Sequence, residues 1–269
     1  MRVEPRLIRS RDNPQVKALL KLARSSREQR ASATTILDGE RLIEAFQASG
    51  GTAEAILATE AAYASPPIRA LMGHAPARAR LLLAEPLVRQ MSQVVTTSGL
   101  LAVVRIPAPQ PIPERVATCL LLECIQDPGN LGSILRSAVA AAIDHVFLSP
   151  GSVYAWSPKV IRAGMGAHFF LSIHEGVAPP ALVGRALGPI IATEPRAVDS
   201  LYDIDLSGPV AWLFGNEGSG LSEEAARIAT RHMRIPMPGA TESLNVAASV
   251  AVCLFEQIRQ RLHAPTPRA

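Results

Sequence analysis

The stretch that decides the fold runs from Val210 to Glu256 and reads VAWLFGNEGSGLSEEAARIATRHMRIPMPGATESLNVAASVAVCLFE. It contains two short apolar runs, Val210 to Phe214 and Met233 to Ile235, and each run ends in a loop that opens onto a helical pattern. We expect both runs to be strands. Loops at the carboxyl ends of neighbouring strands form a crevice, which is the usual ligand position in an open α/β sheet.

The two loops predict the kind of ligand. Residues 215–220, GNEGSG, let the backbone approach a ligand because glycine has no Cβ, and residues 236–245 are braced by prolines. Neither loop has the GxGxxG spacing or the Lys-Ser/Thr pair of phosphate-binding loops. The alternative interpretation is that the glycines only allow a tight turn and that the loop binds no ligand. Four apolar side chains favour a neutral or cationic adenosine compound over a triphosphate: Phe214, Ile235, Met237 and Leu244.

Length and composition predict a globular chain. Its 269 residues, 48% of them hydrophobic, can hold one large or two ordinary domains. The three cysteines form neither a CxxC pair nor an even set, so we expect a reducing compartment and no structural metal. The first residues lack the apolar core of a signal peptide, and no apolar run is long enough to span a bilayer. We therefore expect a cytoplasmic protein.

Positive charge is concentrated at the amino end. Residues 1–30 contain nine basic and three acidic residues, a net charge of +6, whereas the whole chain has +4. Such a segment is the electrostatic footprint of a polyanion partner, and a solvated helix face with a basic bias is the alternative.

A proline-rich stretch divides the chain. Residues 107–117, with four prolines between 107 and 113, are expected to be an extended linker between a domain at 1–106 and a domain at 118–269. The first should be a small α/β unit with a helix from Pro14. Its further elements are expected at Thr35–Leu37, Gly39–Ala48, Ala55–Thr59, Pro66–Gly73, Leu81–Leu83, Glu85–Gln93 and Val103–Ile106.

The second domain is expected to alternate strands and helices. Continuous apolar strands separated by helices predict a parallel sheet that is covered on both faces. Besides the two runs above, the expected elements are strands at Cys119–Ile125, His145–Leu148, Phe169–Ile173 and Pro189–Thr193, and helices from Leu131, Pro158, Pro179 and over Ser243–Arg261.

A third loop, residues 126–136, reads QDPGNLGSILR. We expect Asn130 to cap the following helix and Arg136 to lie on its first two turns. A helix N-terminus with an asparagine and an arginine nearby favours a phosphate or ribose group. A simple cap and a surface arginine are the alternative.

Taken together, the motifs resemble a known family. Asn130-x-Gly132-x-x-x-Arg136, then residues 213–222 (LFGNEGSGLS), then residues 235–247 (IPMPGATESLNVA) look like the three ordered motifs of the SpoU (TrmH-type) RNA 2′-O-ribose methyltransferases of the SPOUT superfamily. The resemblance covers roughly residues 118 to 260. Residues 1–106 are similar to the ribosomal-protein-like RNA-binding domain that many such enzymes carry.

The resemblance implies a deep trefoil knot, a homodimer with the cofactor site near its interface, and S-adenosylmethionine as cofactor. It implies that the cofactor-binding residues are Thr193, Glu194, Phe214, Gly215, Gly218, Ile235, Met237, Ser243 and Leu244. It implies that the catalytic residues are Asn130, Arg136, Glu217, Ser243 and Asn245. We further expect RNA contacts from Asn130, Arg136, Lys159, Arg162, Lys17 and Arg41, with no DNA and no membrane partner.

Methyl transfer to a ribose 2′-hydroxyl needs alignment, removal of a proton and stabilisation of the developing oxyanion. Arg136 is expected to bind the neighbouring phosphate and the oxyanion, because guanidinium stays protonated in proteins. Glu217 or a water then takes the proton, or Glu217 only orients Asn130. Ribosomal RNA is favoured over transfer RNA. Two competing functions stay open: a non-catalytic RNA-binding protein, and an enzyme that methylates a base nitrogen.

Overall fold

A computed structural model describes residues 5–74, 79–94 and 97–263. Arg2 of the basic segment and residues 264–269 of the expected polar tail lie outside this range. The chain forms two compact units: the first unit is Met1–Ala108 with Trp156–Phe169, and the second unit is Pro109–Ala155 with Phe170–Ala269.

The first unit is built on a five-stranded mixed sheet with the order β1-β4-β3-β5-β2. Strand β5 runs antiparallel to β3 and β2, and the other pairs are parallel. The strands are β1 Arg6–Ile8, β2 Thr34–Asp38, β3 Ala55–Ala58, β4 Arg80–Leu83 and β5 Leu100–Arg105. The helices are α1 Pro14–Arg24, α2 Ser26–Ser32, α3 Glu40–Ala48, α4 Glu60–Tyr63, α5 Pro66–Gly73, α6 Glu85–Met91 and α8 Pro158–Ala163.

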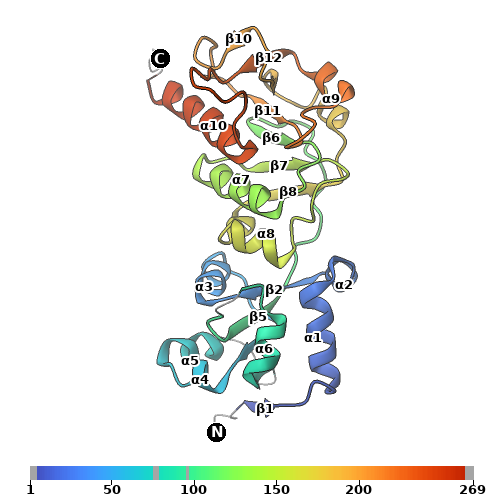
Figure 1. The fold of residues 1–269 in the computed structure, drawn as a ribbon, viewed down its shortest axis with the longest axis vertical. Helices are drawn as coiled ribbons and strands as arrows, with labels where there is room; N and C mark the ends of the chain where they lie inside the picture. The colour runs from blue at the N-terminus through green and yellow to red at the C-terminus, as the bar shows by residue number, and fades with distance from the viewer. Residues whose placement is uncertain (1–4, 75–78, 95–96, 264–269) are drawn as a thin grey trace. The chain divides into compact units, whose positions relative to one another are not determined.

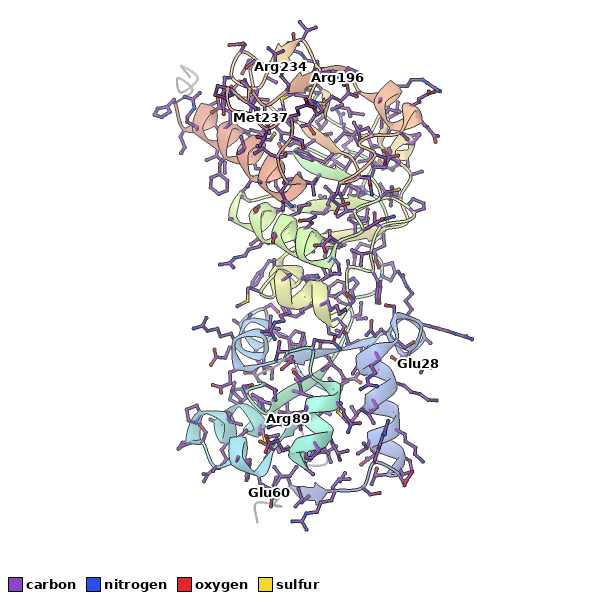
Figure 2. All side chains as sticks on the ribbon, in the orientation of Figure 1. Glu28, Glu60, Arg89, Arg196, Arg234 and Met237 are labelled. Atoms are coloured by element: carbon purple, nitrogen blue, oxygen red, sulfur yellow. The ribbon has the colours of Figure 1, made fainter. Side chains whose placement is uncertain are left out.

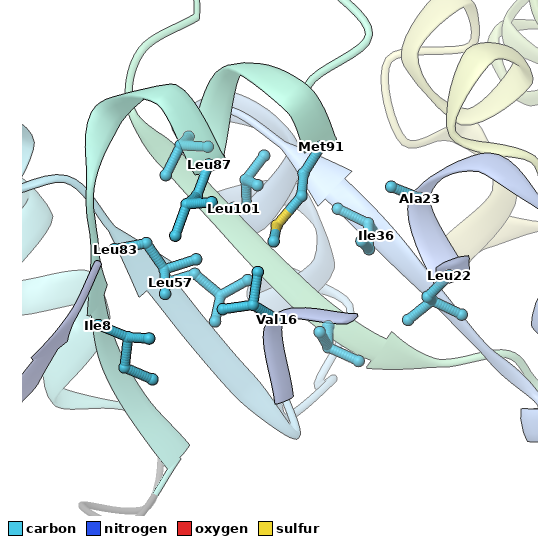
Figure 3. Packing of buried hydrophobic residues seen from close by; sticks show 12 residues of the cluster. Ile8, Val16, Leu22, Ala23, Ile36, Leu57, Leu83, Leu87, Met91 and Leu101 are labelled. Carbon is cyan, nitrogen blue, oxygen red and sulfur yellow. The ribbon is translucent and has the colours of Figure 1, made fainter. Parts of the chain in front are cut away.

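The core of this unit lies between the sheet and the helices α1 and α6 (Figure 3). Val16, Leu22 and Ala23 come from one face of α1, and Val88 and Met91 come from α6. This spacing of three to seven residues is the apolar stripe of a helix that packs on a sheet. Asn13 begins α1, because its side chain accepts the Gln15 N–H at 2.9 Å and Pro14 occupies the first helical position.

Helix α8 belongs to this unit although it follows the linker in sequence. It packs against β2, all of whose residues are buried. The Thr35 hydroxyl donates to the Trp156 carbonyl at 2.8 Å, and the Phe46 and Phe169 rings meet edge to face with centroids 5.0 Å apart. The segment 156–169 thereby packs on β2, the last strand of the sheet.

The second unit is built on a seven-stranded sheet with the order β10-β12-β9-β11-β6-β7-β8, and every paired strand is parallel to its neighbour. The strands are β6 Cys119–Leu122, β7 His145–Leu148, β8 Ser172–Glu175, β9 Ile190–Thr193, β10 Asp199–Ser200, β11 Ala211–Phe214 and β12 Arg231–Arg234. The α-helices are α7 Pro128–Ala140, α9 Glu223–Ile228 and α10 Val246–His263, and a short 3-10 helix spans Pro179–Leu182. A second 3-10 helix, Ala167–Phe170, lies where the chain passes from the first unit to the second.

Both faces of this sheet are covered, as the sequence predicts. Leu121 and Leu213 point to one face, where they form a cluster with Ala225 of α9 and with Leu182. Because side chains alternate along a strand, Trp212 points to the other face. There its Nε1–H donates to Gln257 of α10 at 2.9 Å, and α10 packs along α7 (Figure 1).

Several elements differ from the expectation. Strand β9 lies between β11 and β12, so the two strands of the opening stretch are not direct neighbours. A helix, α2, lies between α1 and Thr35, where no element was expected, and only a 3-10 turn follows Pro179. The expected strand at Phe169–Ile173 is displaced to Ser172–Glu175, since a 3-10 helix occupies residues 167–170.

Two helix boundaries also move, and both follow from capping. Helix α7 begins at Pro128, and its cap is Asp127, whose Oδ1 accepts the Asn130 N–H at 2.8 Å. Asn130 therefore lies inside the first turn and does not cap the helix. Helix α10 begins at Val246, because the Asn245 Oδ1 accepts the N–H groups of the two alanines that follow Val246. No helix of the described residues has the length and apolar character needed to cross a membrane.

Candidate cofactor pocket and active site

A cavity of about 490 Å³ lies at the carboxyl ends of β9, β11 and β12. This volume is within the range of small-molecule sites. Because the strands are parallel, the loops that follow them meet at one edge of the sheet. The cavity is lined by Asn130, Thr193, Glu194, Pro195, Phe214, Gly215, Asn216, Glu217, Gly218, Gly220, Ile235, Met237, Ser243, Leu244, Asn245, Val246 and Ser249.

Three of these side chains form a hydrogen-bonded chain that joins the first turn of α7 to the loops after β11 and β12. The Asn245 Nδ2 donates to the Asn130 Oδ1 at 2.8 Å, and the Asn130 Nδ2 donates to the Glu217 Oε1 at 3.0 Å. The Glu217 carboxylate can only accept, so it fixes which end of the Asn130 amide faces Asn245. Each amide is thereby held in one orientation at the cavity wall.

Glu217 receives further hydrogen bonds from the loop after β6. The backbone N–H groups of Gln126 and Asp127 donate to its two oxygens at 3.4 and 3.3 Å. Partial burial on its own raises the pKa of Glu217, but hydrogen bonds from the Asn130 side chain and from backbone N–H groups outweigh it and hold the pKa below its usual value. Glu217 is therefore a carboxylate at neutral pH and a weak base.

The loop after β11 is folded tightly on itself. A Cβ on Gly215 would lie 2.3 Å from the backbone carbon of Gly220, so only glycine fits at this position. Asn216 and Gly220 exchange backbone hydrogen bonds at 2.9 and 3.0 Å, and the Asn216 Oδ1 accepts the Gly218 N–H at 2.8 Å. These contacts fix the backbone that faces the cavity.

The charges of the cavity lining are all negative. It contains two carboxylates, Glu194 and Glu217, and no lysine or arginine. The Glu194 Oε2 lies 3.3 Å from the His232 Nδ1 of β12. Apolar walls come from Phe214, Ile235 and Leu244. Such a lining favours a ligand with an apolar ring and a positive charge, and it disfavours a triphosphate.

The loop beside Glu194 is anchored by Arg234, which lies in the same part of the second unit as Met237 (Figure 2). The Arg234 Nη1 donates to the Ala197 carbonyl at 2.6 Å and also to the carbonyl of Val198. The guanidinium is thus used to hold the backbone between β9 and β10. Arg234 therefore holds a loop next to the cavity, although its own side chain does not line the cavity.

Arg136 lies outside the cavity. It is exposed on α7, and its side chain makes no hydrogen bond or ion pair with any residue of the described ranges. A separation of six residues places it about 120° around the helix from Asn130 at 3.6 residues per turn. The structure therefore brings Asn130, Glu217, Ser243 and Asn245 to one cavity, with the nine expected cofactor residues, but it does not bring Arg136 there.

The other basic residues expected to bind RNA lie in the first unit. Arg41, Lys159 and Arg162 are exposed and make no ion pair with a described residue. Lys17 is paired with Asp12 at 2.9 Å, and both side chains are more than half exposed. A surface pair of this kind contributes little to stability, so Lys17 remains available to a phosphate.

Five residues of the cavity lining were not among the predicted site residues: Pro195, Asn216, Gly220, Val246 and Ser249. Asn216 and Gly220 lie in the glycine-rich loop 215–220, which was predicted to face a ligand, so both could have been predicted from the sequence. Ser249 follows Asn245 by four residues, which is one helical turn. Pro195 gives no signal of its own, because it enters the cavity only through the path of the backbone after β9.

Comparison with known proteins identifies what the chain is similar to. Residues 117–255 match the model of the SpoU rRNA Methylase family. An uncharacterised tRNA/rRNA methyltransferase of Synechocystis is 32% identical, over 97% of this chain and 96% of its own. A 23S rRNA guanosine 2′-O-methyltransferase of Bacillus subtilis is 28% identical, over 92% of this chain and 97% of its own.

A solved structure agrees over nearly the full length. The AdoMet-bound rRNA methyltransferase of Sinorhizobium meliloti has a TM-score of 0.81 and 27% sequence identity, covering 97% of this chain and 99% of its own. The similarity thus extends over both compact units, beyond the region that the family model matches.

Proposed function

Because the chain belongs to the SpoU rRNA methylase family, we propose that it transfers a methyl group from S-adenosylmethionine to a ribose 2′-hydroxyl of ribosomal RNA. The observation that carries the proposal is the cavity with two carboxylates, no basic residue and the chain Asn245–Asn130–Glu217 on its wall. The relatives named as rRNA methyltransferases support ribosomal RNA as the substrate class.

The cavity fits this cofactor in shape and charge. Phe214, Ile235, Met237 and Leu244 offer apolar walls for an adenine ring, and backbone groups around Gly215 and Gly218 are fixed to receive polar parts. When bound, S-adenosylmethionine supplies a methyl group on a positively charged sulfur. Glu194 and Glu217 provide the negative field that attracts such a cation.

Asn130 is proposed to orient the target ribose. Its amide is held between Glu217 and Asn245, so it meets a hydroxyl in one fixed geometry. Glu217 is proposed to act by holding Asn130, because its hydrogen-bonding capacity is filled by N–H donors and its pKa is lowered. A water then takes the hydroxyl proton.

Arg136 is proposed to bind the phosphate beside the target ribose. Its exposure and its lack of a partner among the described residues leave the guanidinium available, and its position outside the cavity suits a contact with the RNA backbone. Arg136 also stabilises the developing oxyanion if the RNA bends back to the cavity mouth. A fixed positive charge serves this purpose without losing a proton.

Residues 1–106 are proposed to form an RNA-binding domain, with 107–117 as linker and 118–269 as the methyltransferase domain, and α8 is proposed to add to the RNA-binding surface because it packs on β2 of the first unit. Exposed Lys17, Arg41, Lys159 and Arg162 support a surface that contacts phosphates. Double-stranded DNA is not expected as a partner, since the reaction requires a 2′-hydroxyl.

A homodimer is also proposed. Phe255 and Leu262 of α10 are 50% and 77% exposed, and a second copy would cover them. Light scattering of the wild type and of Phe255→Glu tests the dimer.

A trefoil knot and a cytoplasmic location complete the proposal. The knot is supported by the way α10 holds an earlier loop: the side chains of Gln257 and Gln260 donate to the carbonyls of Gly208 and Ile204 at 3.0 and 3.1 Å.

The function is tested in two steps. Calorimetry should show binding of S-adenosylmethionine and none of ATP, because the cavity has no basic residue for phosphates. Radiolabelled methyl transfer to unmodified ribosomal RNA should follow, and the modified linkage should resist alkaline hydrolysis, which needs a free 2′-hydroxyl. Label in an alkali-sensitive linkage would identify a methylated base, and cofactor binding without transfer to ribosomal or transfer RNA would identify a binding protein.

The role of Glu217 is tested by rate against pH. If Glu217 only holds Asn130, Glu217→Gln lowers the rate and keeps the shape of the pH profile. Arg136→Lys keeps the charge but loses the paired donors of the guanidinium, so it should weaken RNA binding without changing cofactor affinity. Loss of the acidic limb of the profile in Glu217→Gln would make Glu217 the base.

A further inference from the structure

Glu123 is a buried carboxylate that the proposed mechanism does not use. It follows β6 directly, only 9% of its surface is exposed, and it makes no ion pair with a described residue. Its Oε2 accepts the Ser222 N–H at 2.8 Å and its Oε1 accepts the Ser222 hydroxyl at 2.7 Å. Burying a carboxylate without a neighbouring cation costs free energy of desolvation. The two short hydrogen bonds from Ser222 offset part of this cost.

The contact closes one end of the loop that forms the cavity wall. Ser222 ends the loop that began at Gly215, and its hydroxyl also accepts the Ala225 N–H at 3.1 Å to begin α9. At the other end of the loop, the Asn216 Nδ2 donates to the Cys124 carbonyl at 2.7 Å. Glu123 and Cys124 are consecutive, so a single point after β6 holds both ends of the loop.

The backbone at this point is itself constrained. Cys124 has a φ of +52°, in the left-handed region that a residue other than glycine rarely adopts. The Ser149 Oγ accepts the Cys124 N–H at 2.9 Å, and the Glu123 N–H donates to the Phe214 carbonyl at 2.9 Å. A backbone conformation of this kind persists only where its surroundings determine it.

We propose that Glu123 is a positioning residue for methyl transfer: through Ser222 it fixes the loop 215–222, and through that loop it places Glu217 and Gly218 at the cavity. The proposal rests on the proposed function. Glu123 does not line the cavity, so its effect reaches the cofactor and Asn130 only through the loop. Neither Glu123 nor Ser222 was among the site residues predicted from the sequence.

The test compares Glu123→Ala with Glu123→Gln and with a matched control. Alanine removes both hydrogen bonds to Ser222. Glutamine keeps an oxygen for the Ser222 N–H and offers an N–H to the Ser222 oxygen, so it should retain the loop. Thr230→Val is the control, because Thr230 makes two hydrogen bonds with the Ile190 backbone, at 3.1 and 3.2 Å, at the opposite ends of the strands.

The readouts are the dissociation constant of S-adenosylmethionine by calorimetry, kcat on ribosomal RNA at saturating cofactor, and hydrogen exchange of the amides of residues 216–222. Glu123→Ala should weaken cofactor binding by about 10- to 100-fold, equivalent to about 1.4 to 2.8 kcal/mol, lower kcat and speed the loop exchange. Glu123→Gln should stay within about threefold of the wild type. Thr230→Val should lower Tm and leave the other three readouts unchanged.

The outcomes separate this inference from the proposed function. A wild-type protein that neither binds S-adenosylmethionine nor methylates RNA overturns both. An active wild type with a Glu123→Ala variant of unchanged affinity, kcat and loop exchange overturns the role of Glu123 alone, as does an equal loss in Thr230→Val. If Glu123→Ala does not fold, Glu123→Asp takes its place in the test. The aspartate side chain is one methylene shorter than glutamate, so its carboxylate cannot reach both the N–H and the hydroxyl of Ser222.

Discussion

The two sheets of the chain place their polar side chains differently. In the second unit every strand pair is parallel, so the loops after β6, β9, β11 and β12 meet at one edge and gather amides and carboxylates around a cavity. In the first unit β5 runs antiparallel to both neighbours while the other four strands share one direction, so β5 ends at the opposite edge of the sheet from the others. The basic side chains of this unit that are expected to bind RNA, Lys17, Arg41, Lys159 and Arg162, instead lie exposed on its helices.

This difference in sheet architecture suits the second unit to a chemical reaction and the first unit to RNA binding. A parallel sheet brings distant parts of the sequence to one point, which a reaction needs because its groups must meet within hydrogen-bonding distance. A mixed sheet covered by charged helices offers a broad surface, which suits the repeated phosphates of RNA. A substitution in one unit should therefore change one property and leave the property of the other unit intact.

The largest effect is expected from Gly215→Ala. The added Cβ would lie 2.3 Å from the backbone of Gly220, so the loop must open and the cavity lose its wall. Binding of S-adenosylmethionine should fall at least a thousandfold, about 4 kcal/mol, by calorimetry. Gly208→Ala is the control, since a Cβ there meets nothing within 4 Å. Normal cofactor binding by Gly215→Ala would mean that this loop does not form the cofactor site.

A loss of stability confined to the first unit is expected from Leu57→Ala. Leu57 is fully buried in the core beneath α1 and α6, so the cavity left by truncation should cost about 2–5 kcal/mol. Each unit contains one tryptophan, Trp156 in the first and Trp212 in the second, so the variants Trp212→Phe and Trp156→Phe report the units one at a time.

In the Leu57→Ala background, the urea transition seen by Trp156 should move to lower concentration. The transition seen by Trp212 should move less, and the affinity for S-adenosylmethionine should stay unchanged. Equal movement of both transitions would show that the two units unfold as one cooperative body, and the comparison between them would then not extend to stability.

The sequence predicted the cavity of the second unit better than the architecture around it. Seven of the nine residues expected to bind the cofactor stand in two unbroken stretches, 213–222 and 235–247, and the other two are Thr193 and Glu194, so most of this cavity lining could be predicted from contiguous sequence. The insertion of β9 between β11 and β12 could not be read, because strand order is set by contacts between distant residues. The same holds for Glu123 and Ser222, which are 99 residues apart.

In the first unit, local signals failed where packing overrides them. No element was predicted in the polar segment that forms α2, yet Ser25 caps this helix, and the Gln29 side chain is buried and donates to the Leu22 carbonyl at 2.8 Å. The segment 156–169 was predicted with the second domain, because chain order suggests it. The Trp156 and Phe169 contacts that join it to β2 and α3 have no local signature.

A moderate effect on RNA binding is expected from the exposed basic residues of the first unit. Lys17→Ala and Arg41→Ala should each weaken binding of ribosomal RNA by a few-fold and reduce the slope of log affinity against log salt by about 0.7–0.9 for each lost phosphate contact. The dissociation constant of S-adenosylmethionine should not change. Arg105→Ala is the control for Arg41→Ala, because it removes the same charge from a residue that is paired with Glu54, whereas Arg41 makes no ion pair with a described residue. An unchanged salt dependence in both test variants would exclude these side chains from the RNA contact.

The smallest effect is a pH dependence confined to the second unit. His174 on β8 is 5% exposed, and its Nε2 lies 3.2 Å from the His145 Nδ1. Burial, and then the charge of His145, lower the pKa of His174 below its usual value of 6.5. Below pH 6.5 the unfolded chain therefore binds more protons at this position than the folded chain. The stability from neutral His174 is fully present above pH 6.5 and is lost as the pH falls toward the folded-state pKa.

The urea midpoint reported by Trp212 should accordingly fall between pH 7.5 and pH 5.5 more than the midpoint reported by Trp156. His174→Gln should flatten this difference, because glutamine does not titrate and its amide can still reach His145. If the Trp212 midpoint falls equally with and without His174, the acid sensitivity comes from other groups. Because the two single-tryptophan variants are compared at the same pH, a general effect of acid on the chain moves both midpoints, and only a group inside the second unit moves the Trp212 midpoint alone.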